Sequence, residues 1–578
     1  MLSVRNIGGM LDRTWAPGNL KAEQHGGITA IVSCQKSYNF NARGLKFMAQ
    51  IQFKGKQFVQ NHHLSVEYHE LIPDKKKSLT ETVSLKDNLI IHGDNLKALK
   101  ALLPTYAGQV KCIYIDPPYN TGNENWAYND NVNSPMMQEW LGRAVDKEDL
   151  TRHDKWLCMM TPRLKLLREL LADDGAIFIS IDDNEQHHLR ILMEDVFGED
   201  NFIEEFIWRS RLGKGATSQN TAKLHEYIIA YAKDIENLGF KTDKRISEKD
   251  GQERLRQWGQ GDRREDRPSM YYSVHSKKYG DIFPKKPDGT DGRWRLSQAS
   301  MEKLIETGGV FFEKQTDGRI EAYKTIPIGT ETNTAYSSIL DSEIVKTTAH
   351  GSIELNTIFG KQVFDYPKPS CLIKEMVSLI THDDNTAIVL DSFAGSGTTA
   401  QAVLELNKED GGNRKFILVE MEDYADKITA ERVRRVIKGI PKAADEVLKK
   451  GLGGSFSYFE LGNPIIPENL LTGKNMPSYR ELARYVFYTA TGEEFKEKAV
   501  DEKRNFIGET AQYEAYLFYK PDVEYLKKTA LTLDMAKSLP ASKKKRLIFA
   551  PAKFLDQEQL DTYNIHFSQL PFEIYRRI

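Results

Sequence analysis

The stretch best suited to chemistry is residues 113–119, where an apolar run is followed by an acid, two prolines and an aromatic ring. The apolar run predicts a buried strand of a parallel sheet. Pro117 and Pro118 cannot continue a strand ladder, so the strand must end at Asp116. Asp116 and Tyr119 are then held at the carboxyl end of a strand, where open α/β sheets bind ligands. A carboxylate beside a flat ring suits a planar base, gripped by its exocyclic amine and stacked on the ring.

A second candidate segment is residues 391–399, which directly follow the apolar run 386–390. Gly395 and Gly397 remove side chains at points where a ligand must approach the backbone. The helix predicted to follow would direct the positive end of its dipole at that ligand. Taken alone, a glycine turn that merely joins a strand to a helix explains this segment equally well.

Together the two segments resemble a known family. The tetrapeptide Asp116-Pro117-Pro118-Tyr119 resembles the catalytic motif of DNA amino-methyltransferases, which methylate adenine N6 or cytosine N4. Residues 391–399 resemble the loop that binds S-adenosylmethionine (AdoMet) in the same family. The tetrapeptide alone would also fit a strand-ending turn with a capping acid. Two motifs, each placed after an apolar strand, argue against coincidence.

The resemblance implies a Rossmann-like α/β methyltransferase fold that is circularly permuted, because the catalytic motif precedes the AdoMet loop. Chain length and the C-terminal extension are most similar to the modification subunit of type III restriction–modification systems. The implied activity is AdoMet-dependent methylation of adenine N6 in double-stranded DNA, with a restriction subunit and a second copy of the chain as expected partners. A stand-alone amino-methyltransferase acting on adenine or cytosine is the alternative, and a non-catalytic nucleic-acid-binding protein is a weaker one.

The resemblance also implies roles for individual residues. Asp116 and a backbone carbonyl, that of Pro117, would accept hydrogen bonds from the amine of a base flipped out of the helix, and Tyr119 would stack on that base. Adenine is expected because the motif begins with Asp, whereas cytosine-N4 enzymes usually begin with Ser. The expected AdoMet contacts are Lys368, Pro369, Asp391, Phe393, Ala394, Gly395, Gly397 and Thr398. No metal ligand is expected, since the methyl group of AdoMet is already activated.

Two further acids are candidates for cofactor contacts. Glu420 ends a predicted strand and follows the glycines at the distance where dinucleotide-type sites place an acid for ribose hydroxyls. Asp94 also ends a predicted strand, and a comparable acid of the resembling family lies near the adenine of AdoMet. A helix N-cap explains Asp94 at least as well.

The elements that must position these residues follow from hydrophobic periodicity. Strands over 89–92 and 111–115, joined by a helix, predict one β-α-β unit with parallel strands. Residues 176–181 predict another buried strand, which ends in Asp182 and Asp183. Paired acids suit metal or acid–base chemistry, but capping of the next helix is the favoured interpretation.

Between the two motif-bearing halves, residues 240–355 lose this periodicity and mix basic residues with aromatics. Such a mixture suits contacts to phosphates and bases, and Arg254, Arg256, Arg293 and Arg295 are the candidate contacts. Acids are numerous too, so a solvated insertion stays open. The expected domains are an N-terminal extension (1–84), a catalytic half (85–239), a target recognition domain (240–355), an AdoMet-binding half (356–440) and a C-terminal accessory or partner region (441–578).

Composition limits the remaining classes of protein. The 578 residues carry a net charge of −2, so any DNA contact must come from a local basic surface. The four cysteines are scattered, and no apolar run is long enough to span a membrane; we expect a cytoplasmic protein. No Gly-x-x-x-x-Gly-Lys-Ser/Thr sequence is present, which argues against a nucleotide-dependent helicase. Methyltransferases that act on RNA or on protein amides remain competitors.

Overall fold

The computed structural model describes residues 38–39, 46–47, 51–121, 152–213, 221–246, 251–327 and 331–570. The chain divides into two compact units, residues 1–52 and residues 53–578. In the first unit, the described residues form a short antiparallel pair of strands, β1 (Tyr38–Asn39) and β2 (Lys46–Phe47). The second unit contains every predicted site residue.

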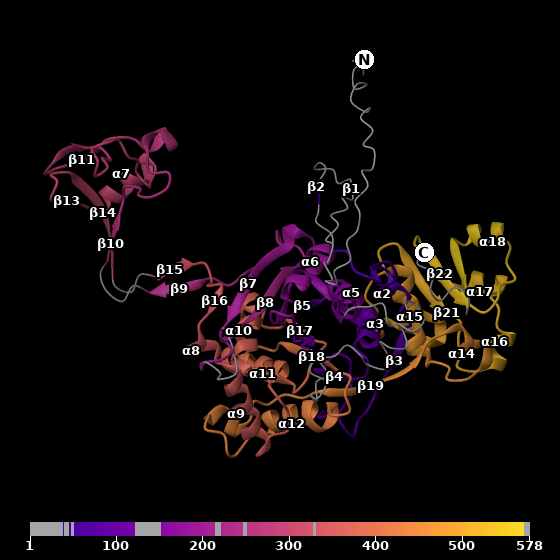
Figure 1. Cartoon of the computed structure of the whole chain (residues 1–578). Coiled ribbons are helices and arrows are strands. Elements are labelled where there is room, and N and C mark those ends of the chain that lie inside the picture. The colour runs from indigo at the N-terminus through magenta and orange to yellow at the C-terminus, as the bar shows by residue number, and fades with distance from the viewer. Residues whose placement is uncertain are drawn as a thin grey trace, which may run out of the picture. The chain divides into compact units, whose positions relative to one another are not determined.

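A mixed sheet of ten strands forms the centre of the second unit (Figure 1). The strands from β6 to β19 run parallel, whereas β8 and β3 run antiparallel to their neighbours. In spatial order the strands are β16 (Ile339–Leu340), β7 (Phe202–Trp208), β8 (Glu226–Ala232), β6 (Leu171–Ile181), β5 (Val110–Ile115), β17 (Ile388–Asp391), β18 (Lys415–Glu420), β4 (Leu89–His92), β19 (Ser457–Pro464) and β3 (His69–Pro73).

The strands that carry the two sequence motifs are neighbours in this sheet. β5 and β17 pair in parallel, with Leu390 opposite Ile113. Every residue of β5 is buried, and the strand ends at Ile115, directly before the acid and the two prolines. Because the carboxyl ends of parallel strands meet at one edge of a sheet, the two motifs converge there.

The predicted β-α-β unit is only partly as expected. β4 and β5 run in the same direction, as predicted, and α3 (Asn95–Tyr106) connects them. They are not neighbours, because β18 and β17 lie between them. The C-terminal half of the fold thus inserts its strands between those of the N-terminal half, which sequence periodicity alone does not reveal.

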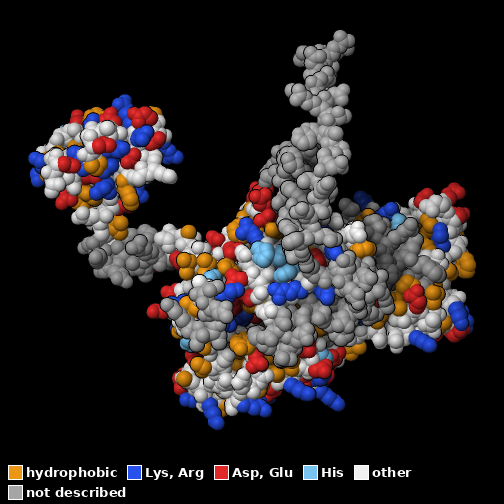
Figure 2. Space-filling view, viewed as in Figure 1, with side chains coloured by type: hydrophobic (Ala, Val, Ile, Leu, Met, Phe, Trp, Pro, Cys, Tyr) orange, Lys and Arg blue, Asp and Glu red, His pale blue; other side chains and the backbone are white. Residues whose placement is uncertain are grey.

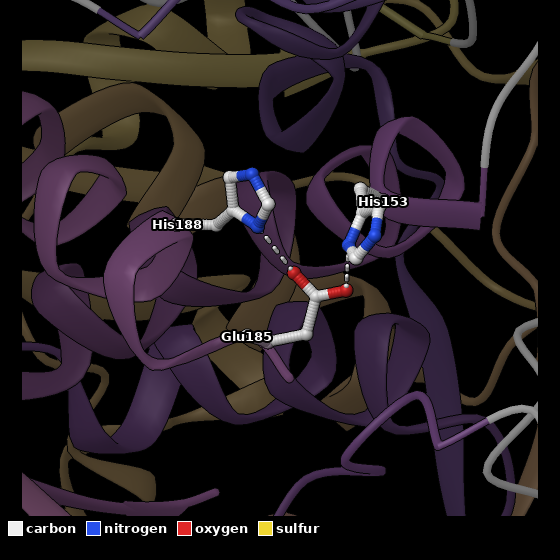
Figure 3. Close-up of side chains that lie close together, drawn as sticks. All are labelled: His153, Glu185 and His188. Carbon is white, nitrogen blue, oxygen red and sulfur yellow. Dashed lines mark hydrogen bonds and ion pairs between the residues drawn. The ribbon is translucent and has the colours of Figure 1, made fainter. Parts of the chain in front are cut away.

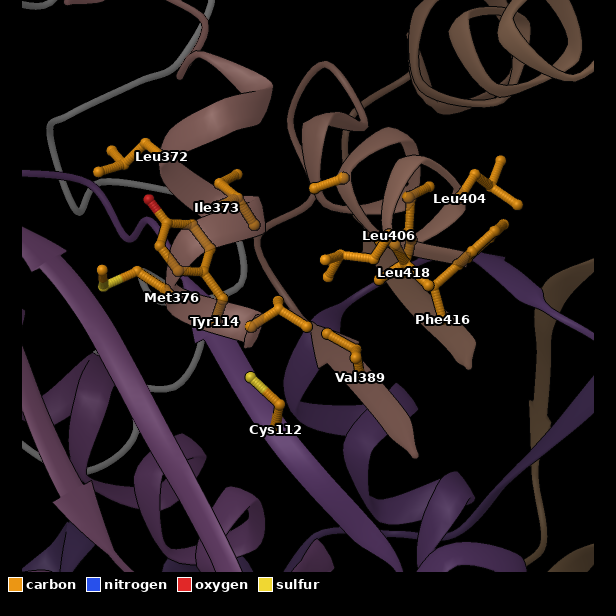
Figure 4. Close-up of a cluster of buried hydrophobic side chains, with 14 of the residues drawn as sticks. Cys112, Tyr114, Leu372, Ile373, Met376, Val389, Leu404, Leu406, Phe416 and Leu418 are labelled. Carbon is orange, nitrogen blue, oxygen red and sulfur yellow. The ribbon is translucent and has the colours of Figure 1, made fainter. Parts of the chain in front are cut away.

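Helices cover both faces of the sheet. On one face α3 packs against α5 (Arg152–Leu170), which in turn packs against α6 (Gln186–Phe197). On the other face α10 (Ser370–Thr381) packs on β5 and beside α11 (Thr398–Asp410). Figure 4 shows the resulting core, in which Tyr114 and Cys112 of β5 meet Ile373 and Met376 of α10. Within the described residues, no helix is long and apolar enough to cross a membrane.

Part of the predicted recognition region has a hydrophobic core of its own. β10 (Gly251–Arg254), β14 (Ile320–Ile326) and β13 (Val310–Lys314) form an antiparallel sheet that accompanies α7 (Gln298–Glu306) and the hairpin of β11 (Val274–Ser276) and β12 (Gly280–Ile282). Its buried residues are Leu255, Val274, Ile282, Trp294, Met301 and Ala322. β9 (Asp243–Ile246) and β15 (Glu331–Thr334) pair where the chain enters and leaves this part. In contrast, Leu340 and Val345 of the predicted region belong to the core of the central sheet.

The two ends of the second unit also contribute to the central sheet. β3 lies in the predicted N-terminal extension and β19 in the predicted C-terminal region, yet they pair with each other, and β19 also pairs with β4. The rest of the C-terminal region forms a sheet in the order β20 (Phe506–Glu509), β21 (Tyr513–Leu517), β22 (Lys545–Ala550) and β23 (Ile565–Gln569). In this sheet β21, β22 and β23 run parallel, and β20 runs antiparallel to β21.

Candidate active site

One pocket, of about 250 Å³, lies at the carboxyl ends of β5 and β17. It brings the two predicted halves of the site together, since both Asp116 and Gly395 line it. The sequence-predicted residues in its lining are Asp116, Pro117, Tyr119, Lys368, Asp391, Phe393, Ala394, Gly395 and Thr398. Five other predicted residues do not line it: Asp94, Pro118, Pro369, Gly397 and Glu420.

Asp116 presents one bonded and one unbonded carboxylate oxygen. Its Oδ2 accepts a hydrogen bond from Lys368 Nζ at 2.7 Å, and the lysine side chain is only 9% exposed. Its Oδ1 is buried and has no hydrogen-bond partner among the described residues. A buried acceptor without a donor is costly, so this oxygen is prepared for a donor that a ligand would bring.

The ring of Tyr119 is fixed at both its hydroxyl and one face. Its hydroxyl donates to Glu226 Oε2 at 3.1 Å, and Lys368 Nζ lies 4.9 Å from the ring centroid. Burial, with the nearby carboxylates of Asp116 and Glu226, raises the pKa of the Tyr119 hydroxyl well above its ordinary value. Tyr119 therefore acts in its neutral form, as a hydrogen-bond donor and an apolar surface.

The two prolines of the tetrapeptide have different surroundings. The carbonyl of Pro118 accepts a hydrogen bond from Trp156 Nε1 at 2.7 Å, which ties the loop to α5. Pro117 lines the pocket instead. Of the two carbonyls, that of Pro118 is thus already engaged by the protein, consistent with the prediction that Pro117 supplies the acceptor.

The turn that follows β17 is held by its own acid. Asp391 accepts from the backbone N–H of Phe393 at 3.0 Å and from the hydroxyl of Thr399 at 2.5 Å. Burial raises the pKa of the Asp391 carboxyl to about 7. Gly397 has φ 79°, and a Cβ added there would lie 3.0 Å from the backbone oxygen of Thr429. Glycine at 397 therefore meets both a left-handed turn and a close backbone approach.

Glu420 supports the pocket without lining it, whereas Asp94 caps a helix. The Glu420 carboxylate accepts from the backbone N–H groups of Gly395 at 2.6 Å, Met421 at 2.9 Å and Glu422 at 3.0 Å. Burial raises the pKa of Glu420 to about 8. Asp94 accepts from the N–H of Lys97 at 3.1 Å and caps α3, so the N-cap alternative is confirmed.

A buried arginine beneath the turn was not singled out from the sequence. Arg432, in α12 (Glu431–Lys438), is fully buried and donates to Gln401 at 2.9 Å, Thr398 at 2.6 Å and Ser396 at 3.0 Å. Glu354 lies 3.5 Å away as its ion-pair partner. The sequence shows only a basic helix there, and periodicity does not distinguish its buried arginine from its exposed ones.

Charged residues also line the pocket, and of these the sequence singled out the two acids after residue 181 but not Lys223 and Glu226. Asp182, Asp183, Lys223 and Glu226 all line the pocket. Asp183 pairs with Lys223 at 2.8 Å rather than capping α6, so the capping interpretation is wrong for this acid. Asp182 and Asp183 could have been placed at the pocket because they follow the strand predicted at 176–181. That strand, part of β6, pairs with β5 in the sheet, which the sequence alone does not show.

Residues 110–431 match the family described as DNA methylase, which groups N6 and N4 methyltransferases, and this match covers more than half of the chain. The chain belongs to the DNA methylase family. It is 32% identical to the Mod subunit of the type III restriction–modification enzyme StyLTI from Salmonella typhimurium, over 72% of this chain and 66% of that protein. It is 35% identical to the type II methyltransferase M.KpnI from Klebsiella pneumoniae, over 61% of this chain and 84% of that protein.

A solved cytosine-N4-specific methyltransferase, PvuII, aligns with 61% of this DNA methylase chain at 13% identity and a TM-score of 0.31. The family match confirms the predicted DNA amino-methyltransferase with an α/β fold, and AdoMet is its methyl donor. The predicted likeness to type III modification subunits is confirmed as well, and the chain spans about two thirds of the length of the StyLTI subunit.

Proposed function

We propose that this DNA methylase transfers the methyl group of AdoMet to adenine N6 in double-stranded DNA, as the modification subunit of a type III restriction–modification system. The observation that carries the proposal is the single pocket in which an unpaired Asp116 oxygen faces the same space as the glycine turn after β17. A site that must bring an amine to an activated methyl group needs both features within one cavity.

The turn after β17 fits AdoMet. Bound there, AdoMet supplies the activated methyl group. Phe393, Ala394 and Gly395 would contact it, because their segment lines the pocket and lies at the start of a helix. Glu420 would act indirectly, because its carboxylate already accepts three backbone hydrogen bonds and holds Gly395 in place. Asp94 is left with a structural role as a helix cap.

The other side of the pocket fits the amine of a flipped base. Asp116 Oδ1 and the Pro117 carbonyl would accept its two N–H groups, drawing the nitrogen toward tetrahedral geometry and turning its lone pair to the methyl group. Lys368 holds Asp116 in position through Oδ2, which leaves Oδ1 for the base. Because Lys368 lies over one face of Tyr119, the base would stack on the other face. Positioning, not acid–base chemistry, would supply most of the rate.

Recognition of the DNA sequence would fall to the part of the chain with its own core, residues 251–327, rather than to all of 240–355. Arg256 does not fit the predicted DNA contact: it is 2% exposed and pairs with Glu321 through both Nε and Nη2, at 2.6 and 3.1 Å. Figure 2 shows positive and negative side chains interspersed on the visible surface of this domain. DNA contacts would therefore come from exposed residues such as Arg263, Arg267 and Trp258.

A stand-alone methyltransferase is the second candidate, because M.KpnI is matched over more of its length than the StyLTI subunit is. In the favoured case, the chain would pair with a second copy and with a restriction subunit in the cytoplasm, where the DNA is. Size-exclusion chromatography with a co-expressed restriction subunit would distinguish the two cases. Co-elution supports the modification subunit, and independent elution supports the stand-alone enzyme.

The chemical assignment has a direct test. The full chain is incubated with methyl-labelled AdoMet and plasmid DNA, and the DNA is digested to nucleosides. Label in N6-methyldeoxyadenosine supports the proposal. Label in N4-methyldeoxycytidine would overturn the base assignment, and label only with RNA would overturn the substrate.

A further inference from the structure

Two histidines and a glutamate meet beside the catalytic loop, and none of the three lines the pocket. His153 belongs to α5, Glu185 precedes α6, and His188 belongs to α6. His153 Nδ1 lies 2.7 Å from Glu185 Oε1, and His188 Nδ1 lies 2.9 Å from Glu185 Oε2 (Figure 3). The three ligand atoms all lie within 4.8 Å of one another.

The glutamate is unusual for its burial and its partners. Glu185 is 0% exposed, and among the described residues no lysine or arginine pairs with it. Its carboxylate is instead contacted by the two imidazoles and by the side-chain amide of Asn120. Buried carboxylates in proteins are paired, hydrogen-bonded or bound to a metal ion, and the groups turned to Glu185 are two imidazole nitrogens, which are themselves metal ligands.

The geometry points to a divalent metal site formed by His153, Glu185 and His188, with Zn²⁺ as the ion that the donor set favours. Two imidazole nitrogens and one carboxylate oxygen are a known three-ligand set for zinc, which leaves a fourth position for water. The imidazole side chains are 34% and 26% exposed, so an ion can enter from solvent to the buried carboxylate. Figure 2 shows histidine side chains exposed over α6.

A second buried group next to the cluster lacks a partner. Asn120 is fully buried, and its Oδ1 has no hydrogen-bond partner among the described residues, while its Nδ2 donates to Glu185. A water on the open position of the ion would supply a donor to this neighbourhood.

The site would brace the catalytic loop rather than join in methyl transfer. Asn120 directly follows Tyr119 and has φ 57°, a left-handed conformation that its side-chain hydrogen bond must help to hold. None of the three proposed ligands lines the pocket. The inference does not depend on which base is methylated, and a failure of either proposal leaves the other standing.

The test uses the untagged full-length chain, stripped with a chelator and then titrated with Zn²⁺ against a chromophoric competitor. We expect one equivalent to bind, and Co²⁺ in place of Zn²⁺ to give the visible absorption of a low-coordinate site. His153→Ala and His188→Ala should each weaken binding about tenfold or more, because each removes a ligand. Circular dichroism and AdoMet binding report whether the variants are folded.

His92→Ala is the matched control, since His92 Nδ1 contacts Glu460 at 2.7 Å in an ordinary histidine–carboxylate pair. This variant should bind Zn²⁺ as the parent does. A parent protein that takes up no Zn²⁺ or Co²⁺ overturns the inference without reference to any variant, and the cluster is then a proton-sharing one. Undiminished binding in both His153→Ala and His188→Ala overturns it as well.

Discussion

The side chain of Tyr119 illustrates how much of the site one residue type predicts. Its place in the pocket follows from the strand and the prolines before it, so it was predictable. Its hydrogen bond to Glu226 was not predictable. Glu226 begins β8, which lies beyond β6 and β7 along the chain and carries no recognised motif. The same holds for Lys368, whose predicted place was the AdoMet pocket and whose bond to Asp116 only the fold reveals.

Tyr119 provides a prediction that separates its ring from its hydroxyl. Tyr119→Phe keeps the stacking surface and loses the hydroxyl with its bond to Glu226, so it should retain most methyl transfer. Tyr119→Ala removes stacking worth about 1–3 kcal/mol per base and should cost roughly one to two orders of magnitude in rate. Single-turnover rates with saturating DNA measure both. Equal losses in the two variants would show that the hydroxyl, not the ring, carries the function.

The turn after β17 was predicted as an element, but its support was not. Gly395, Gly397 and the following helix were all inferred from local sequence, because glycines and apolar periodicity are local signals. The buried arginine that holds the turn comes from α12 and its ion-pair partner from α9 (Thr348–Phe359). Such a contact joins elements that are distant along the chain, and no single segment records it.

Arg432 is therefore expected to stabilise both the fold and the cofactor pocket. Arg432→Met removes the hydrogen bonds to Gln401, Thr398 and Ser396 and the ion pair with the partly buried Glu354, and the loss of buried hydrogen bonds of this kind should cost about 1–3 kcal/mol of unfolding free energy. AdoMet affinity should fall too, since the variant frees the side chains of Ser396 and Thr398. Denaturant unfolding and calorimetry measure the two effects.

Arg435→Met is the control on the same helix. Arg435 pairs with Glu431 at 2.8 Å but is 40% exposed, so its loss should cost at most about 1 kcal/mol and leave AdoMet binding unchanged. If the two variants behaved alike, the special role of Arg432 would have to be abandoned.

At the scale of the whole chain, the two sequence motifs were enough to predict one site formed by segments far apart in the sequence. The strands that precede these motifs, β5 and β17, are indeed neighbours in the sheet. The pairing of β3 with β19 was not predictable, because strands at opposite ends of a sequence carry no mark of their partner. The bounds 240–355 of the recognition domain stay a prediction: residues 251–327 contain a separate core, whereas Leu340 and Val345 pack in the core of the central sheet.

Exchange of residues 251–327, the proposed recognition part, should change the DNA sequence that is methylated. Residues 251–327 have their own core, so replacing them with the matching segment of a relative with another site should give a folded hybrid. Sequencing of methylated adenines should then reveal the relative's site, with AdoMet affinity unchanged. An active hybrid that still marks the original site would place recognition elsewhere. Arg256→Ala, in contrast, should destabilise this part, because the buried Glu321 loses both hydrogen bonds from Arg256 and keeps only its ion pairs with Arg254 and Arg319.

The most direct test of the account compares binding and chemistry in Asp116→Ala. Asp116 is assigned to the base amine and not to the cofactor, so calorimetry should give an AdoMet dissociation constant within a few-fold of the parent. Under single-turnover conditions the same variant should show no measurable methyl transfer, because the remaining carbonyl cannot position the amine alone. A loss of AdoMet affinity as large as the loss of rate, or a rate close to that of the parent, would contradict the role of Asp116 on which the account depends.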